Sequence, residues 1–191
     1  MPKQLFRHFN KYVELTEDDF QKMFRYFELR TVKKKEVLVE VGSICKDNHF
    51  VLDGCLHMFF VNDKGIERTV QFAIENWWMT DDLAYLNQTT TDFSIQAVEN
   101  TRLLTITHGK QEQLLKEFPQ LEKYFRTIYQ ISYGAALVKM RYLFGLTKEE
   151  IYFHFTEQFP LFAQRVPQYL IASFLGLTPE YVSEIRAKKR S

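Results

Sequence analysis

The sequence predicts an α+β fold. An N-terminal antiparallel β roll of the jelly-roll type (a double-stranded β-helix), flanked by helices, precedes a long helix and a C-terminal helix–turn–helix domain. Three observations predict this fold. Short runs rich in β-branched and aromatic residues fill 29–106, a helical apolar pattern follows Pro119, and short helical segments follow Gly145. We therefore expect three parts, at residues 1–116, 117–146 and 147–191.

Composition places the chain among globular proteins. It has 191 residues, of which 46% are hydrophobic and 26% charged, and its net charge of +1 indicates no particular partner. Residues 164–191, however, carry five basic and two acidic side chains, a local excess that favours contact with nucleic acid. The longest uncharged stretch of the helical part, Thr127–Val138, is too short to span a membrane. We expect a cytoplasmic protein without membrane contact.

The first part combines helices and strands. Residues 1–28 show helical apolar spacing, with Thr16 as a helix start before Asp18 and Asp19. The Asn62–Gly65 segment separates two strand-like runs and predicts a hairpin. The expected strands lie at 36–41, 50–52, 56–61, 68–74, 93–98 and 102–106.

The long helix is expected from Pro119 to about Leu143, and a heptad seam runs along it. The spacings along the seam are 4, 3, 4, 3 and 4 residues, which favour a homodimer in which two such helices pair. Packing against the β roll of the same chain is the alternative. Gly134 beside the middle of the seam would let two backbones approach closely. The seam, and so the expected dimer interface, consists of Tyr124, Ile128, Ile131, Ala135, Val138 and Tyr142.

The C-terminal part contains the most informative pattern. Thr147 and Glu150 form a capping box that starts its first helix. Ala172 and Gly176 stand four residues apart, as the helix crossing and the turn of a DNA-binding helix–turn–helix require, and Val182 follows six residues later. Glycine fits the turn because the turn needs positive φ. The whole frame consists of Ile171, Ala172, Leu175, Gly176, Leu177, Val182 and Ile185.

The second helix of this unit has a clear start. Thr178 is a capping residue, Pro179 suits the first helical position, and Glu180 favours the positive end of the helix dipole. Its cations suit DNA phosphates, and its glutamates can accept a hydrogen bond from cytosine N4. An αα-hairpin with a solvated basic tail is the alternative. The candidate DNA-binding residues are Thr178, Pro179, Glu180, Tyr181, Ser183, Glu184, Arg186, Lys188, Lys189 and Arg190.

Over residues 10–190 the chain resembles the CRP/FNR family of transcription regulators, most specifically in residues 166–186, VPQYLIASFLGLTPEYVSEIR. The resemblance implies a cyclic-nucleotide-binding-like sensor domain at 1–116, a dimerisation helix at 117–146 and a DNA-binding domain at 147–191. Double-stranded DNA and a second copy of the chain are the implied partners. The family's base-reading Arg-Glu…Arg trio falls on Pro179, Glu180 and Glu184. Only Glu180 matches it, so the operator is expected to differ from the typical one.

The resemblance also places a phosphate cassette on about Trp78–Ala97, with its Gly-Glu pair near Asp81 and Asp82 and its arginine near Thr91. Residues 69–101 contain no Lys, Arg or Gly, so we expect no cyclic-AMP binding through such a cassette. Another small-molecule effector remains a candidate partner, although core packing is the alternative role for the aromatic residues here. The candidate effector pocket consists of Trp78, Asp81, Asp82, Leu83, Thr91 and Phe93.

No catalytic or metal-binding constellation is found. Cys45 and Cys55 cannot supply the four thiolates of an iron–sulfur cluster and are expected to be buried thiols. Haem ligation is an alternative to a structural role for the histidines His49, His57 and His108. Asp81 and Asp82, as neighbours on an extended segment, would point to opposite faces. We expect no enzyme and no cofactor. The competing function is a ligand-sensing or interaction module whose helix–turn–helix does not bind DNA.

Overall fold

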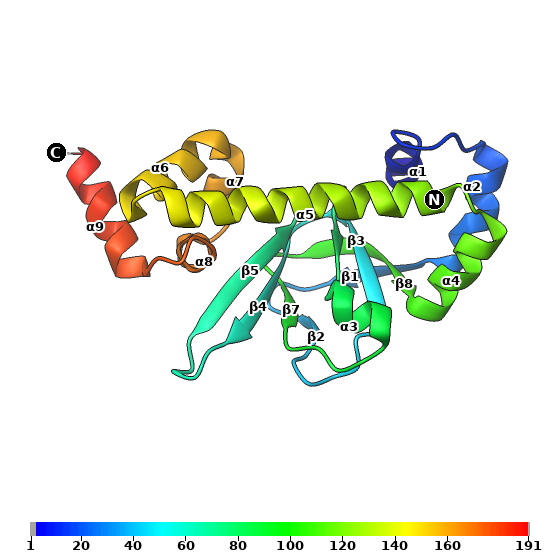
Figure 1. Cartoon of the computed structure of the whole chain (residues 1–191), viewed down its shortest axis with the longest axis horizontal. Coiled ribbons are helices and arrows are strands. Elements are labelled where there is room, and N and C mark those ends of the chain that lie inside the picture. Colours follow the sequence, from blue (N-terminus) through cyan, green and yellow to red (C-terminus); the bar gives the residue numbers. More distant parts are fainter. Residues whose placement is uncertain (1–2, 191) are drawn as a thin grey trace. The chain divides into compact units, whose positions relative to one another are not determined.

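The computed structural model describes residues 3–190, except for the side chains of Lys189 and Arg190. The chain divides into two compact units. The first contains Met1–Phe60 and Gln71–Gln130, and the second contains Val61–Val70 and Ile131–Ser191. Helix α5 (Leu121–Gly145) runs without a break from one unit into the other (Figure 1).

The first unit begins with helix α1 (Lys3–Phe9), helix α2 (Glu17–Met23) and the 3-10 turn η1 (Phe24–Tyr26). Thr16 caps α2, because its Oγ1 accepts the Asp19 N–H at 3.1 Å and the Asp19 carboxylate accepts the Thr16 N–H at 3.0 Å. This reciprocal capping box satisfies two backbone donors that the helix leaves unpaired. The expected helix start at Thr16 is confirmed.

Two antiparallel sheets form the roll, and in residues 3–190 each has four strands. Their orders are β1-β8-β3-β6 and β2-β7-β4-β5. The strands are β1 (Glu28–Val32), β2 (Val37–Val39), β3 (Asp47–Asp53), β4 (Leu56–Val61), β5 (Glu67–Ala73), β6 (Trp78–Met79), β7 (Ser94–Ala97) and β8 (Thr101–Thr107). The predicted α+β class with a β roll is confirmed. Strands β1 and β6 and helix α3 (Asp82–Asn87) were not predicted.

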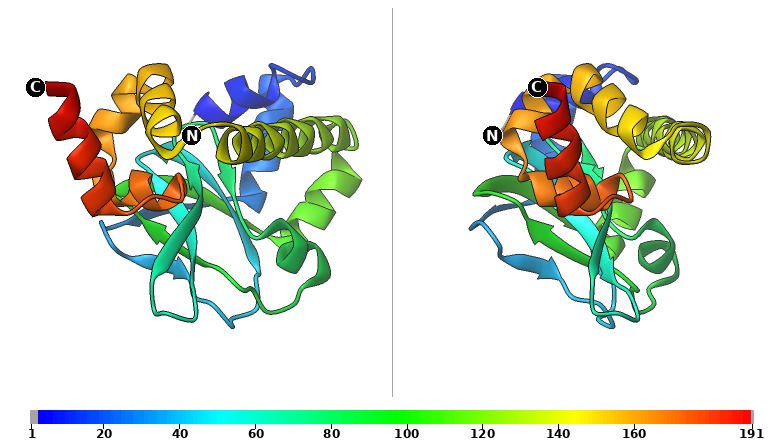
Figure 2. Two further views of the ribbon diagram at one scale, coloured as in Figure 1. Left: turned by 60° about the vertical axis from the view of Figure 1, so that its left-hand side comes forward. Right: turned by 90° about the vertical axis from the view of Figure 1, so that its left-hand side faces the viewer.

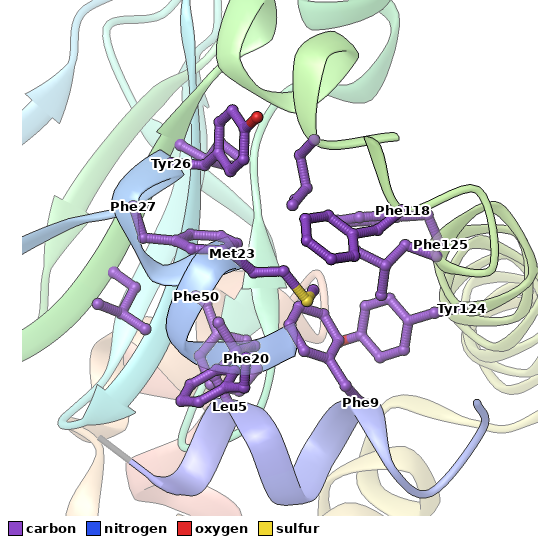
Figure 3. Close-up of a cluster of buried hydrophobic side chains, with 14 of the residues drawn as sticks. Leu5, Phe9, Phe20, Met23, Tyr26, Phe27, Phe50, Phe118, Tyr124 and Phe125 are labelled. Atoms are coloured by element: carbon purple, nitrogen blue, oxygen red, sulfur yellow. The ribbon is translucent and has the colours of Figure 1, made fainter. Parts of the chain in front are cut away.

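An aromatic core lies between the helices and the sheet that contains β3 and β8. Figure 3 shows the Met23 side chain beside the rings of Phe9, Tyr124 and Phe125. The rings of Phe9 and Tyr124 meet edge to face with centroids 4.6 Å apart. The Tyr124 hydroxyl is satisfied inside this core, because it accepts the Trp78 Nε1–H at 2.8 Å and pairs with His8 Nδ1 at 2.7 Å. Helix α4 (His108–Glu117) leads into α5.

The second unit contains the hairpin tip between β4 and β5 and four short helices. At the tip, the Gly65 N–H donates to the Asn62 carbonyl at 2.9 Å, so the expected hairpin is confirmed. Thr147 and Glu150 form the expected capping box. The helices, coloured from yellow to red in Figure 2, are α6 (Lys148–Gln158), α7 (Pro160–Arg165), α8 (Gln168–Phe174) and α9 (Pro179–Arg190). Among the described residues, none of the helices has the length and apolar character that crossing a membrane requires.

Candidate nucleic-acid interface

Helices α8 and α9 form a helix–turn–helix. Ala172 is fully buried, and its carbonyl accepts the Leu177 N–H at 2.8 Å across the turn. Gly176 has φ of +71°, and a Cβ added there would meet only a Leu143 methyl at 3.9 Å. Backbone conformation rather than space therefore requires glycine at this position. The frame residues Ile171, Ala172, Leu175, Leu177, Val182 and Ile185 are all buried.

The start of α9 is capped and accessible. Thr178 Oγ1 accepts the Tyr181 N–H at 3.2 Å, as expected of a capping residue. The Ser183 hydroxyl donates to the Pro179 carbonyl at 3.0 Å and keeps lone pairs free to accept from a ligand. Tyr181 is half-buried, whereas the other described candidates on this surface are exposed, namely Thr178, Pro179, Glu180, Ser183, Glu184, Arg186 and Lys188.

The charges on this surface are partly paired. Lys188 Nζ lies 2.7 Å from Glu184 Oε1, and this hydrogen bond raises the pKa of Lys188, as does the negative charge of Glu149 to a smaller extent. Exposed pairs of this kind stabilise little, so a phosphate can compete for the ammonium group. The expected phosphate contacts of Lys189 and Arg190 involve side chains that lie outside the described part of the structure.

The segment expected to hold a phosphate cassette carries a carboxylate at the start of its helix. Asp81 caps helix α3, with Oδ1 accepting the Ala84 N–H at 3.2 Å. Its other oxygen, Oδ2, accepts the Thr91 hydroxyl at 2.7 Å. The expectation that Asp81 and Asp82 lie on an extended segment is therefore wrong, because Asp82 is the first residue of a helix. The sequence signal for α3 is Asp81 itself, a preferred capping residue.

The other candidates for the effector pocket do not share one environment. Trp78 was expected to line the pocket, but it packs in the aromatic core, with its ring centroid 5.5 Å from that of Phe125. Its assignment is corrected to the core-packing alternative, since the helices cover the strand that carries it. Leu83 is 71% exposed, and Phe93 is half-buried with its ring edge on Phe60. Of the six candidates, the structure joins Asp81 to Thr91 by a hydrogen bond, and the Phe93 N–H donates to Thr91 Oγ1 at 3.1 Å.

The histidines considered for haem ligation have other contacts in the roll. His49 Nδ1 lies 3.0 Å from Thr105 Oγ1, and His57 Nε2 lies 3.2 Å from Gln96 Oε1. The His108 ring packs edge to face on Tyr85. Cys45 and Cys55 are both free and buried, as expected. Burial raises the pKa of Cys45, so its thiol stays protonated at neutral pH.

The expected dimer seam on α5 is only partly available. Tyr124 and Ile128 are buried in the core of their own chain, so their assignment to a dimer interface is corrected. This outcome is the alternative that the sequence left open for the seam. Of the remaining seam residues, Ile131, Ala135 and Val138 are exposed, and Tyr142 packs on His154 with ring centroids 4.5 Å apart.

Sequence reasoning missed a second apolar stripe on α5, although its heptad spacing of 4, 3 and 4 residues is visible in the sequence. We call Tyr133, Leu137, Met140 and Phe144 the exposed stripe; their side chains are 67%, 47%, 49% and 84% exposed, respectively. At 100° per residue these four positions fall on one narrow face of the helix. The stripe therefore presents a continuous apolar surface.

Comparison with known proteins supports this architecture. Residues 29–118 match the family model of the cyclic nucleotide-binding domain. No curated protein sequence matches the chain. Several solved structures share its fold at low sequence identity, and each of the three described next covers most of the chain.

FixK2 from Bradyrhizobium japonicum is 15% identical over 85% of this chain and 83% of its own, with a TM-score of 0.73. The c-di-GMP-responsive global regulator CLP of Xanthomonas campestris is 13% identical over 92% of both chains, with a TM-score of 0.73. A CooA variant from Carboxydothermus hydrogenoformans is 18% identical over 94% of this chain and 81% of its own, with a TM-score of 0.69. The resemblance to CRP/FNR regulators is thus confirmed at the level of the fold.

Proposed function

We propose that this chain is a cytoplasmic, homodimeric transcription regulator that binds a specific double-stranded DNA sequence through the start of α9. The observation that carries the proposal is the accessible, capped start of α9 on a buried helix–turn–helix frame. In DNA-binding units of this kind the second helix enters the major groove and its first turns contact base edges. The fold shared with known regulators supports the same function.

Two kinds of contact follow from the side chains on α9. The carboxylates of Glu180 and Glu184 accept hydrogen bonds and suit the amino group of cytosine N4 in the major groove. Arg186 and Lys188 are exposed cations that suit phosphate oxygens. Because two carboxylates face the bases, we expect a preference for sites whose C·G pairs present cytosine to this helix.

A dimer would hold two such helices on one duplex. We assign the dimer contact to the exposed stripe rather than to the predicted seam, because the chain's own core covers the first two seam residues. Apolar side chains repeating at heptad spacing pair with those of a second helix. Two copies of the helix–turn–helix then bind half-sites about one helical turn apart.

The cassette segment supports regulation without cyclic AMP. A phosphate placed at the start of α3 would meet the carboxylate of Asp81, and residues 69–101 supply no Lys or Arg to offset the repulsion. Asp81 and Thr91 already satisfy each other and the Ala84 N–H. We therefore expect that DNA binding does not depend on a cyclic nucleotide.

Fluorescence anisotropy with a promoter-derived duplex and a scrambled duplex, at two salt concentrations, tests the proposal. We expect tighter binding to the promoter and a steep fall in affinity with salt, because phosphate contacts release counterions. Glu184→Gln should change the preference between duplexes. Arg186→Glu should weaken binding to both duplexes and flatten the salt dependence. Lys123→Glu, an equal charge reversal at an exposed position of α5, is the matched control.

Adding cyclic AMP should leave all affinities unchanged. A wild-type chain that binds no duplex at low salt would favour the competing function, an interaction module with an inactive helix–turn–helix. Binding that depends on cyclic AMP would contradict the assignment of the cassette.

A further inference from the structure

Ser173, on the first helix of the helix–turn–helix, is hydrogen-bonded to the β hairpin. Its Oγ accepts the Thr69 N–H at 2.9 Å and donates to the Glu67 carbonyl at 3.0 Å. Both hairpin groups belong to the backbone of β5, which lies beside α8 in Figure 1. One hydroxyl thus fills a donor and an acceptor role at once and ties α8 to the hairpin residues 61–70.

Lys139 joins the same two elements to α5. Its Nζ donates to the Val70 carbonyl at 3.0 Å and lies 3.6 Å from the centre of the Phe174 ring. Burial lowers the pKa of Lys139 to about 8, so the ammonium remains mostly protonated at neutral pH. A partly desolvated ammonium is attracted strongly by an aromatic face. Lys139 therefore links α5, β5 and α8 through one side chain.

These contacts leave the candidate DNA-binding residues at the start of α9 free. They involve Ser173 and Phe174 at the end of α8, whereas the start of α9 stays accessible, with Glu180 and Glu184 exposed. A contact that covered the start of α9 would prevent DNA binding. A contact at α8 instead fixes the direction in which α9 is presented.

We infer that the hairpin 61–70 is a brace that orients the helix–turn–helix for DNA, with Ser173 and Lys139 as its positioning residues. This inference rests on the proposed function. The cause is orientational: without the brace, α8 and α9 sample other directions relative to α5, and only a fraction of the molecules presents α9 correctly. The apparent affinity falls in proportion to that fraction.

Distance measurement by pulsed electron paramagnetic resonance tests the brace without DNA. Spin labels at Lys64→Cys on the hairpin and Tyr169→Cys on α8 occupy exposed positions, and the two native cysteines are buried. Labelled chain is diluted with excess unlabelled chain, so that only distances within one chain are recorded. We expect a narrow distribution in the otherwise wild-type protein and a broad one after Lys139→Met and Ser173→Ala together.

Anisotropy on the unlabelled variants tests the consequence for DNA. If about a tenth of the molecules keeps the binding orientation, affinity falls about tenfold. The salt dependence should stay as in the wild type, because neither residue touches phosphate in this proposal. Lys139→Arg with Ser173→Thr keeps the donors, the cation and the hydroxyl and should restore binding. Lys123→Met and Thr156→Ala are controls; the Thr156 hydroxyl bonds only to carbonyls of its own helix among the described partners.

Each outcome decides one of the two ideas. A narrow distribution in the double variant overturns the brace whatever happens with DNA. A broad distribution with unchanged affinity overturns the positioning role, and so does a flattened salt dependence, which would make Lys139 a direct phosphate contact. If the wild type binds no duplex, the proposed function fails, and the distance measurement alone decides whether the hairpin holds α8.

Discussion

The apolar side chains of α5 are buried in its first half and exposed in much of its second half. In the first half, Leu121, Tyr124, Phe125 and Ile128 are buried in the core of their own unit. In the second half, the residues of the exposed stripe remain between 47% and 84% exposed. The apolar spacing is helical throughout. Periodicity therefore predicts that a stripe exists, but it does not reveal what covers it.

The difference arises from the partners each half meets. The first half faces rings from α1 and from β3 and β6, and even the Tyr124 hydroxyl has buried partners in His8 and Trp78. In the second half, Lys139 meets a carbonyl and a ring, and the Tyr142 ring packs on His154. The residues of the exposed stripe lie at positions of the helix other than these, and their apolar side chains remain available to a second copy of the chain.

The largest expected effect contrasts two tyrosines on this helix. Tyr124→Ala removes a fully buried ring and should lower the free energy of unfolding by about 3–5 kcal/mol. Tyr133→Ala, on the exposed stripe, should change it by less than about 0.5 kcal/mol when the chain is dilute. Urea unfolding followed by tryptophan fluorescence measures the first effect, because Trp77, Trp78 and Tyr124 belong to the first unit. Far-ultraviolet circular dichroism, which reports the loss of helix, measures the second, because Tyr133 lies in the helical second unit.

A similar loss of stability in the two variants would contradict the conclusion that only the first half of α5 is buried in the core. Tyr124→Phe separates the contribution of the ring from that of the hydroxyl, because this change keeps the ring and removes only the hydroxyl that bonds to Trp78 and His8. It should cost about 1–3 kcal/mol, the range for a buried polar group that loses its partner.

A second prediction uses pH to weaken the first half alone. Burial, with a smaller contribution from Lys11, lowers the pKa of His8 from 6.5 to about 4. Between these pH values the unfolded chain binds a proton at His8 and the folded chain does not. The free energy of unfolding therefore falls as the pH drops from 6.5 towards 4, and the contribution of neutral His8 is fully present above pH 6.5. The loss attributable to His8 should be about 2–3 kcal/mol.

Urea unfolding at pH 7, 6 and 5 measures this loss. His8→Gln cannot take up the proton and should show a shallower dependence on pH than the wild type. Its remaining slope includes His49, whose pKa burial also lowers, to about 3. Equal slopes for the two proteins would show that His8 does not titrate within the core.

Features set by local chemistry were predictable from the sequence. The capping boxes at Thr16 and Thr147 and the start of α9 at Thr178 follow from residues within one helical turn. The turn at Gly176 follows from its need for positive φ. Because each of these signals is local, the sequence alone is enough to place the helix–turn–helix and its accessible residues.

Features set by long-range contacts were not predictable. Tyr124 meets His8 from 116 positions away, and Ser173 meets Glu67 from 106 positions away. Neither pairing leaves a local pattern. Strand β6 has two residues, too few to show an alternation. The assignment of Trp78 to an effector pocket was wrong for the same reason. The sequence around an aromatic residue on a strand is the same whether a ligand or a helix covers its ring.

The smallest expected effect on stability concerns the two faces of the second half of α5. The same variants test which of these faces pairs with a second copy of the chain. Leu137→Asp and Met140→Asp place charges on the exposed stripe, whereas Ile131→Asp and Ala135→Asp place them on the predicted seam. All four positions are exposed, so each change should alter the free energy of unfolding of the dilute chain by less than about 0.5 kcal/mol.

Sedimentation velocity over a range of protein concentrations then separates the faces. The stripe variants should sediment as monomers and lose affinity for a two-half-site duplex, because two apolar faces cannot bury an aspartate without a partner charge. The seam variants should remain dimers. The reverse pattern would return the interface to Ile131 and Ala135, and dimers in all four variants would exclude both faces of this half of α5.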